Sequence, residues 1–364
     1  MADFNLTELA LKSVCPSNAV KYDDKEMPSI MVYIPKFRLC DVLTTSDSST
    51  HPAFIVNGKE IDGFWYSKYQ NVTNNGRLYS LPAEDPATSG ITLDVATAYA
   101  EAKGAGWHES TAAERAAIAL WCKKNGTMPY GNNNFGKDSR ETSYRAIKTT
   151  ADTADPTKTD HVATGTGPLT WSHDGTPSGI WDLNGNVWEW QAGLRLVNGE
   201  LQIIPNNNAA DSTNDKSDTS ALWKAIDAAT GNLVTPNGAG TTAGTVKLDF
   251  VASTSKFTYT TTIANTKGSF GCSFRDVSAD GTIGAAAQLL LRALAMLPES
   301  GDTAYDDDGF WVDNSQAERC LWSGGSWGNG ASAGVFGVSL SNGRSKSSPS
   351  RGCRSAFCTI PSND

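Results

Sequence analysis

Cysteine and histidine are the side chains of this chain best suited to metal binding or nucleophilic chemistry, and their spacing favours neither. The seven cysteines include no Cys-x-x-Cys pair. None of the four histidines, His51, His108, His161 and His173, stands three or four residues from another. A metal face on one helix needs that spacing. We therefore expect free thiols and isolated surface histidines, with ligands that converge from loops as the open alternative.

Small polar residues are concentrated in the C-terminal run from Leu321 to Phe357. Along its middle part, apolar Phe336, Val338 and Leu340 alternate with small Gly337, Ser339 and Ser341. Successive side chains of a strand point to opposite faces. The alternation predicts a strand whose apolar side packs inward while its small polar side faces solvent. Such a surface suits ligand binding better than it suits a reaction centre.

Three motifs carry a family resemblance. The run GIWDLNGNVWEW (residues 179–190), GGSW (324–327) and GCR (352–354) resemble the formylglycine-generating enzyme family, although that family has Phe at the position of Cys353. The resemblance implies an α+β protein with a C-type lectin-like fold of the formylglycine-generating enzyme subtype. It says little about function, because one fold hosts many activities.

We assign scaffold roles to the motif residues. The glycines permit tight turns, the tryptophans fill the core, and Asp182, Asn186 and Glu189 satisfy backbone donors of loops. Arg344 and Arg354 are expected to donate to buried carbonyls or carboxylates through their forked guanidinium groups. The full scaffold set is Trp181, Asp182, Gly185, Asn186, Trp188, Glu189, Trp190, Gly325, Trp327, Arg344 and Arg354.

This chain lacks the residues that the enzyme family needs for its chemistry. The two cysteines that bind copper in that family fall on Asn329 and Gly334, which supply no thiolate. The related iron enzymes need clustered histidines, and the calcium-ligand tripeptide of sugar-binding lectins is absent. We therefore expect no catalytic residues, no enzymatic activity and no cofactor. A structural Ca²⁺ on Asp302, Asp306, Asp307, Asp308 and Asp313 remains an alternative to a solvated acidic loop.

The C-terminal run also resembles the variable region of target proteins of diversity-generating retroelements, which carry a lectin fold of this type at the end of the chain. Ser and Gly are one and two adenine changes from the Asn codons that such elements randomise. The resemblance implies a variable ligand-binding set: Gly328, Asn329, Ser332, Gly337, Ser339, Ser341, Asn342, Lys346, Ser348 and Ser350.

This second resemblance implies a phage tail-tip protein that binds a bacterial cell-surface receptor, either protein or glycan. Other virion tail proteins are implied as partners, and a homotrimer is the implied assembly. A host-encoded diversified surface-binding protein is the first alternative, and an oxidase of the formylglycine-generating type is the second.

Charge and hydropathy are consistent with that interpretation. The chain has 30 basic and 39 acidic residues and a net charge of −9, which argues against nucleic-acid binding. No run is long and apolar enough to span a membrane. The N-terminal residues lack the features of a signal peptide. We therefore expect assembly in the host cytoplasm and a final location on the virion tail.

The pattern along the chain predicts its organisation. We expect a leader at 1–27, a lectin-like domain over 28–198 and 301–364, and an insertion at 199–300. Strands are expected at 31–35 and 64–69 because both runs are rich in aromatic and β-branched residues. Helices are expected at 92–103, from the capping box at Thr111 to Gly126, at 219–229 and at 282–296.

Overall fold

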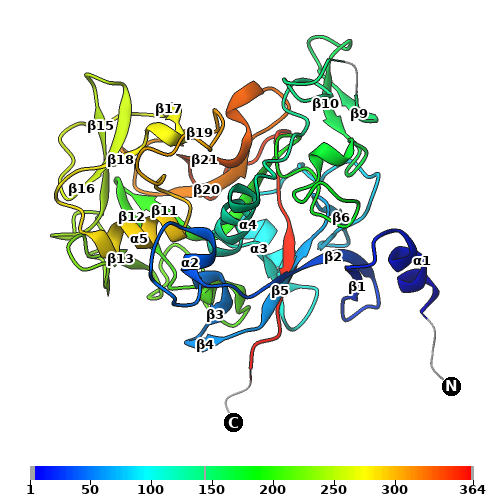
Figure 1. The fold of residues 1–364 in the computed structure, drawn as a ribbon, viewed down its shortest axis with the longest axis horizontal. Helices are drawn as coiled ribbons and strands as arrows, with labels where there is room; N and C mark the ends of the chain where they lie inside the picture. The colour runs from blue at the N-terminus through cyan, green and yellow to red at the C-terminus, as the bar shows by residue number, and fades with distance from the viewer. Residues whose placement is uncertain (1–4, 143–144, 362–364) are drawn as a thin grey trace.

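Helices and strands are interspersed throughout the chain, in an α+β arrangement (Figure 1). The computed structural model describes residues 5–142 and 145–361. Two larger sheets and three two-stranded hairpins make up its β structure.

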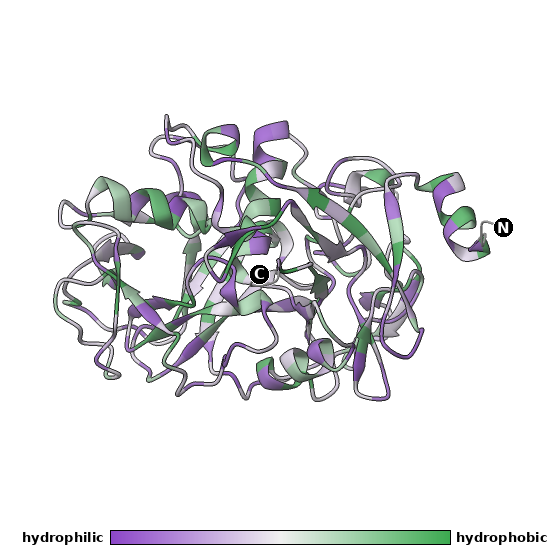
Figure 2. Ribbon diagram, turned by 90° about the horizontal axis from the view of Figure 1, so that it is seen from below, coloured by the Kyte–Doolittle hydropathy of each residue, from purple (hydrophilic) through white to green (hydrophobic). Residues whose placement is uncertain are grey.

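The smaller of the two larger sheets has the strand order β1-β2-β5-β23-β8. Its strands are β1 (Asn18–Tyr22), β2 (Pro28–Pro35), β5 (Gly63–Ser67), β23 (Ser355–Phe357) and β8 (Trp107–Glu109). β2 and β5 confirm the two strands expected at 31–35 and 64–69, although β5 ends at Ser67. β1 pairs with β2 from within the expected leader. Only α1 (Leu6–Val14), which has no buried side chain, stands out from the body of the molecule (Figure 2).

The second sheet runs β17-β19-β21-β20-β11-β12-β15-β16-β18. These strands are β17 (Phe270–Ser273), β19 (Gly309–Val312), β21 (Gly334–Asn342), β20 (Arg319–Gly324), β11 (Trp188–Val197), β12 (Glu200–Ile203), β15 (Lys247–Val251), β16 (Lys256–Thr260) and β18 (Ser278–Ala279). Three short strands join its margins: β13 (Lys224–Ile226) and β14 (Leu233–Val234) beside β12, and β22 (Arg351–Gly352) beside β11. Residues 199–300 therefore extend the same sheet that contains β20 and β21.

The hairpins and the other helices lie around these sheets. The hairpins are β3 (Ile55–Val56) with β4 (Lys59–Glu60), β6 (Val72–Asn74) with β7 (Arg77–Tyr79), and β9 (Lys148–Ala151) with β10 (Thr159–Val162). The helices are α2 (Leu39–Val42), α3 (Leu93–Glu101), α4 (Ala112–Asn125) and α5 (Ala285–Ala293). α3 and α4 confirm two predicted helices, with Thr92 and Thr111 as their N-caps and Gly126 in the left-handed region after α4.

The main core lies between the two sheets, and α4 runs through it (Figure 1). Residues 112–120 of α4 are all buried, which explains why this helix lacks a polar stripe. Its run of alanines lets both sheets approach closely. β21 contributes Phe336, Val338 and Leu340 to this core, which confirms the inward side of the predicted alternation.

Two helices expected in the 199–300 segment need correction. No helix forms at 219–229, where Lys224–Ile226 is instead strand β13, paired with β12 and β14. Sheet pairing overrides the local helical pattern there. The second helix is shorter than the predicted 282–296, because Gly284 is the N-cap of α5 and Ala295 adopts a positive φ of 49°.

Candidate ligand-binding surface

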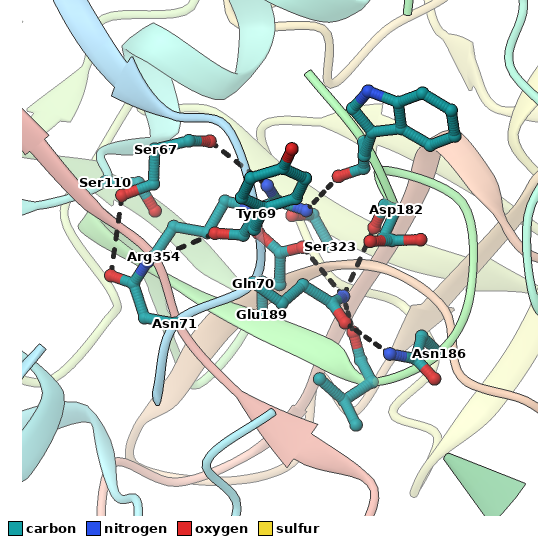
Figure 3. Close-up of polar contacts among 12 residues, drawn as sticks. Ser67, Tyr69, Gln70, Asn71, Ser110, Asp182, Asn186, Glu189, Ser323 and Arg354 are labelled. Carbon is teal, nitrogen blue, oxygen red and sulfur yellow. Dashed lines mark hydrogen bonds and ion pairs between the residues drawn. The ribbon is translucent and has the colours of Figure 1, made fainter. Parts of the chain in front are cut away.

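A buried polar network ties the central motif to both sheets (Figure 3). Arg354 is fully buried and donates from Nε to Glu189 Oε2 at 2.8 Å. Its Nη1 and Nη2 donate to the carbonyl oxygens of Ser67 and Trp181 at 3.1 and 2.6 Å. Gln70 Nε2 reaches Glu189 Oε1 at 3.0 Å and the carbonyl of Val187 at 2.9 Å. The forked cation thereby joins β5, β11 and the C-terminal segment.

The turn before β11 is held by side chains of the same motif. Asp182 and Asn186 adopt positive φ values of 61° and 60°. Asn186 Oδ1 accepts from the backbone N–H of Val162 at 2.9 Å, and Asp182 Oδ2 accepts from that of Gly165 at 2.8 Å. Burial raises the pKa of Asp182 to about 6. A Cβ at Gly185 would overlap the carbonyl oxygen of Asn132, so only glycine fits this turn.

Four tryptophans cover the face of the second sheet that points away from the main core. The rings of Trp190 and Trp322 meet edge to face at 4.7 Å between centroids, and those of Trp188 and Trp311 meet in the same way at 5.3 Å. Trp190 Nε1 donates to the carbonyl of Ile91 at 3.2 Å. Trp311 is half-buried, whereas the other three are buried. Edge-to-face contacts of this kind fix the rings relative to one another.

Two predicted surface positions on β21 are buried. Ser339 is 5% exposed and lies between Trp311 of β19 and Trp322 of β20 in the strand registers. Gly337 is also buried, and a Cβ there would meet the carbonyl oxygen of Gly334 at 2.9 Å. The prediction that this side of β21 faces solvent is therefore wrong for Gly337 and Ser339. Ser341 is half-buried, and its Oγ is enclosed without a hydrogen-bond partner among the described residues.

The connection from β20 to β21 is accessible and structured. Gly328 is exposed, and Asn329 and Ser332 are half-buried. Asn329 Oδ1 accepts from the N–H and the hydroxyl of Ser326 at 2.8 and 2.9 Å. Gly325 adopts a φ of 83°, and a Cβ there would overlap Ala333. These contacts support the turn that the loop makes between β20 and β21.

His161 joins this loop to the segment that carries Ser348 and Ser350. Its ring lies 5.0 Å from that of Trp327, and its Nε2 lies 2.9 Å from the carbonyl oxygen of Pro349. Ser348 and Ser350 are half-buried, with 3.0 Å between their hydroxyl oxygens. The structure thus places part of the predicted set on two connected segments.

Asn342 and Lys346 lie at the other end of β21. Arg344, between them, donates to Glu318 through Nε at 2.8 Å and Nη2 at 2.9 Å, and to Asp94 through Nη1 at 2.8 Å. Its carbonyl oxygen accepts from the N–H of Leu93 at the start of α3. We define the candidate surface as the exposed and half-buried members of the predicted set that His161 connects: Gly328, Asn329, Ser332, Ser348 and Ser350.

The two positions aligned with the copper-binding cysteines have other roles. Asn329 closes the Ser326 turn. A Cβ at Gly334 would overlap the carboxylate of Asp308, which is buried and accepts from the N–H of Phe336 at 2.7 Å. Burial raises the pKa of Asp308. A cysteine side chain would displace this carboxylate from the start of β21.

The acidic residues considered for calcium point to separate partners. Asp302 pairs with Lys123, Asp306 with Arg140, Asp307 with Arg275 and Asp313 with Arg319, while Asp308 binds the backbone of β21. Within residues 5–142 and 145–361, no three His, Cys, Asp or Glu side chains are grouped as metal ligands would be. The five aspartates therefore have separate cationic or backbone partners in this structure.

The histidines are buried, contrary to the prediction that they lie isolated on the surface. All four are 5% exposed or less, and each is hydrogen-bonded. His161 is the one that borders the candidate surface. Sequence reasoning missed it, and it also missed Trp311 and Arg351, which lie outside the motifs. Two signals were available in the sequence. One is Trp311, between Gly309 and Val312, and the other is Arg351, beside the serine run.

Comparisons with known proteins add little. No family model matches the chain, and no curated protein matches it. It is similar to two solved structures, the Major Tropism Determinant P3c Variant and the Major Tropism Determinant U1 Variant. The sequence identities are 11% and 10%, the TM-scores are 0.30 and 0.29, and each alignment covers 93% of this chain and 71% of the other. TM-scores and sequence identities this low do not allow a fold subtype or a function to be transferred to this chain. In the part of the chain described here, no helix has the length and apolar character needed to cross a membrane.

Proposed function

We propose that this protein is a non-enzymatic receptor-binding protein whose C-terminal run displays a diversified ligand-binding surface on a C-type lectin-like scaffold. The proposed location of the protein is a phage tail tip, and the proposed partner is a protein or glycan on a bacterial surface. The observation that carries the proposal is the candidate surface itself. Small polar residues from two segments of one run are joined through His161 and held by a buried framework.

The rigidity of that framework supports binding rather than turnover. β21 is paired on both sides, with β19 and β20, and Arg354 anchors the chain just after the serine segment. A fixed backbone leaves little conformational entropy to lose when a ligand binds. Substitutions at the exposed positions can therefore change which ligand is bound while the fold is kept.

Ser, Gly and Asn side chains offer little apolar area, so a single copy should bind weakly. A homotrimer, or another multivalent arrangement on a virion, would raise the avidity. We include such an assembly, together with contacts to other tail proteins, in the proposal.

The test is binding of the fluorescently labelled full chain to a panel of bacterial strains. The Gly328→Tyr/Ser332→Tyr variant adds large contact groups to the candidate surface. A Cβ at Gly328 meets only the ring of Phe135, at an ordinary contact distance of 3.6 Å. The expected result is a changed pattern of bound strains with an unchanged thermal unfolding midpoint.

The matched control is Ser46→Tyr/Ser253→Tyr, which adds the same groups at two exposed serines outside this surface. Its binding pattern should equal that of the wild type. Equal effects of both variants, or binding of no strain by any of them, would contradict the proposal. Oxidation of a cysteine-containing peptide by the purified protein would instead favour the oxidase alternative.

A further inference from the structure

Arg351 differs from its neighbouring arginines in having no acidic partner. Of the four arginines between residues 319 and 354, Arg319 pairs with Asp313, Arg344 with Glu318 and Arg354 with Glu189. Among the described residues, no carboxylate lies within ion-pair distance of Arg351. It is nevertheless half-buried, next to Ser348 and Ser350 of the candidate surface.

The side chain of Arg351 is held in place by neutral contacts only. Its guanidinium carbon lies 3.9 Å from the centre of the Trp322 ring, and its Nη1 donates to the hydroxyls of Ser348 and Ser350. Burial alone lowers the pKa of Arg351 to about 10, so the group stays cationic at neutral pH. A cation stacked on an aromatic ring is oriented but not neutralised.

The side of the Arg351 guanidinium that lacks a partner consists of Nε and Nη2. In two other arginines of this run the same side of the guanidinium binds a carboxylate. Arg344 holds Glu318, and Arg319 holds Asp313, through Nε together with Nη2. In Arg351 the Nε is enclosed without an acceptor, and Nη2 has no partner among the described residues and is not enclosed. Nη2 is therefore the donor of this side chain that a ligand carboxylate can reach, whereas the enclosed Nε is closed to one.

Trp311 offers an apolar platform in the same cluster of tryptophans. A Cβ on Gly271 would overlap the five-membered part of the indole, and a Cβ on Gly309 would overlap the six-membered part. The indole therefore lies flat across both glycines, with its other face directed away from the sheet. Trp188 contacts the Trp311 ring and pairs in the β11–β22 register with Arg351, so one tryptophan links the platform to the strand that carries the cation.

We infer that the ligand of this surface is a carboxylate-bearing saccharide, with its carboxylate on Nη2 of Arg351 and a sugar ring on Trp311. The inference rests on the proposed function and names the class of receptor. A pyranose has a flat face of C–H groups that matches an indole, whereas an acidic peptide would use Arg351 without needing Trp311.

The test measures binding of the full chain to three immobilised, multivalent probes: 3′-sialyllactose, the methyl ester of the same trisaccharide, and poly-glutamate. The ester keeps the sugar and removes only the charge. We expect binding to the acid form to exceed binding to the ester by at least about tenfold. Arg351→Gln should remove that preference. Lys124→Gln, which removes an exposed cation on α4, should leave it unchanged.

Two further variants separate the roles of charge and platform. Arg351→Lys keeps the charge but loses the planar guanidinium that stacks on Trp322 and holds Nη2 in place, so binding should fall. This variant also provides a test if Arg351→Gln folds poorly. Trp311→Leu should weaken binding of the acid trisaccharide without affecting binding of poly-glutamate. A stronger response to poly-glutamate than to the acid trisaccharide would assign the surface to an acidic peptide and overturn the inference.

The outcome is distinguishable from failure of the proposed function. If the Gly328→Tyr/Ser332→Tyr variant changes strain binding while 3′-sialyllactose fails to bind, the receptor-binding function stands and the saccharide inference is wrong. If strain binding also fails, both are wrong.

Discussion

At the scale of single residues, burial separates two serines that look equivalent in the sequence. Ser339 is buried between Trp311 and Trp322 in the strand registers, whereas Ser332 lies on the loop before β21. Both belong to the run of small polar residues, but Ser339 is 5% exposed whereas Ser332 is half-buried. The alternation along β21 was read correctly for Phe336 and Val338. The burial of the opposite side of β21 could not be predicted from this run, because Trp311 belongs to another strand.

Ser339→Tyr should therefore destabilise the protein by about 1–3 kcal/mol, the usual cost of inserting a large group into a packed region. Ser332→Tyr should change the free energy of unfolding by less than about 0.5 kcal/mol. Urea denaturation of both variants and the wild type provides the comparison. Equal losses would show that the tryptophans move aside readily at Ser339.

At the scale of elements, the start of α4 connects the core helix to the 199–300 segment. Thr111 Oγ1 accepts from the N–H of Glu114 at 3.1 Å and donates to Asn207 Oδ1 at 2.6 Å. Glu114 Oε2 accepts in turn from the N–H of Thr111 at 3.2 Å. The capping box was predictable from four consecutive residues. Its partner Asn207 lies 96 positions away and could not be predicted without the fold.

Thr111→Val, which keeps the shape but removes the hydroxyl, should cost about 1–2 kcal/mol of stability. Thr111→Ser should restore most of that loss. Thr92→Val, at the less buried cap of α3, is the matched control and should cost less. Chemical denaturation midpoints would decide, and a serine variant as unstable as the valine variant would contradict the role given to the hydroxyl.

The same contrast explains which elements the sequence could and could not predict. α3, α4, β2 and β5 carry their own caps or β-rich runs, and they form close to the expected positions. Residues 219–229 have a helical pattern when the sequence is considered alone. In the fold, however, Lys224–Ile226 pairs with β12, and this pairing determines the local structure. The GCR motif (352–354) drew attention to Arg354, whereas Arg351 belongs to no motif and is recognised only by its missing acidic partner among the described residues.

At the scale of the whole molecule, the buried titratable groups make stability depend on pH. Burial lowers the pKa of His51 and of His173 to about 4. In the unfolded chain these groups titrate near 6.5. Their contribution is therefore complete above pH 6.5 and is lost as the pH falls towards 4, where the unfolded state binds more protons. Asp182, with its pKa raised to about 6, acts in the opposite direction.

The free energy of unfolding of His51→Gln should consequently fall less steeply between pH 6.5 and 4.5 than that of the wild type. One such histidine accounts for at most about 1.4 kcal/mol per pH unit. Urea denaturation at pH 7.0, 6.0, 5.0 and 4.5 would measure both slopes. Parallel curves would mean that His51 does not titrate differently in the folded protein.

Because β23 lies between β5 and β8, the smaller sheet forms completely only when the chain continues past the serine segment. The strand that completes the smaller sheet follows the serine segment in the chain, and Arg354 just before it neutralises Glu189. A frameshift or stop codon within residues 328–350 would remove both, leaving the smaller sheet interrupted and an unpaired carboxylate in the interior. Substitutions in that run leave both in place. The fold thus depends on an uninterrupted C-terminal run, whereas substitutions at its exposed positions leave the smaller sheet and the Arg354–Glu189 pair intact.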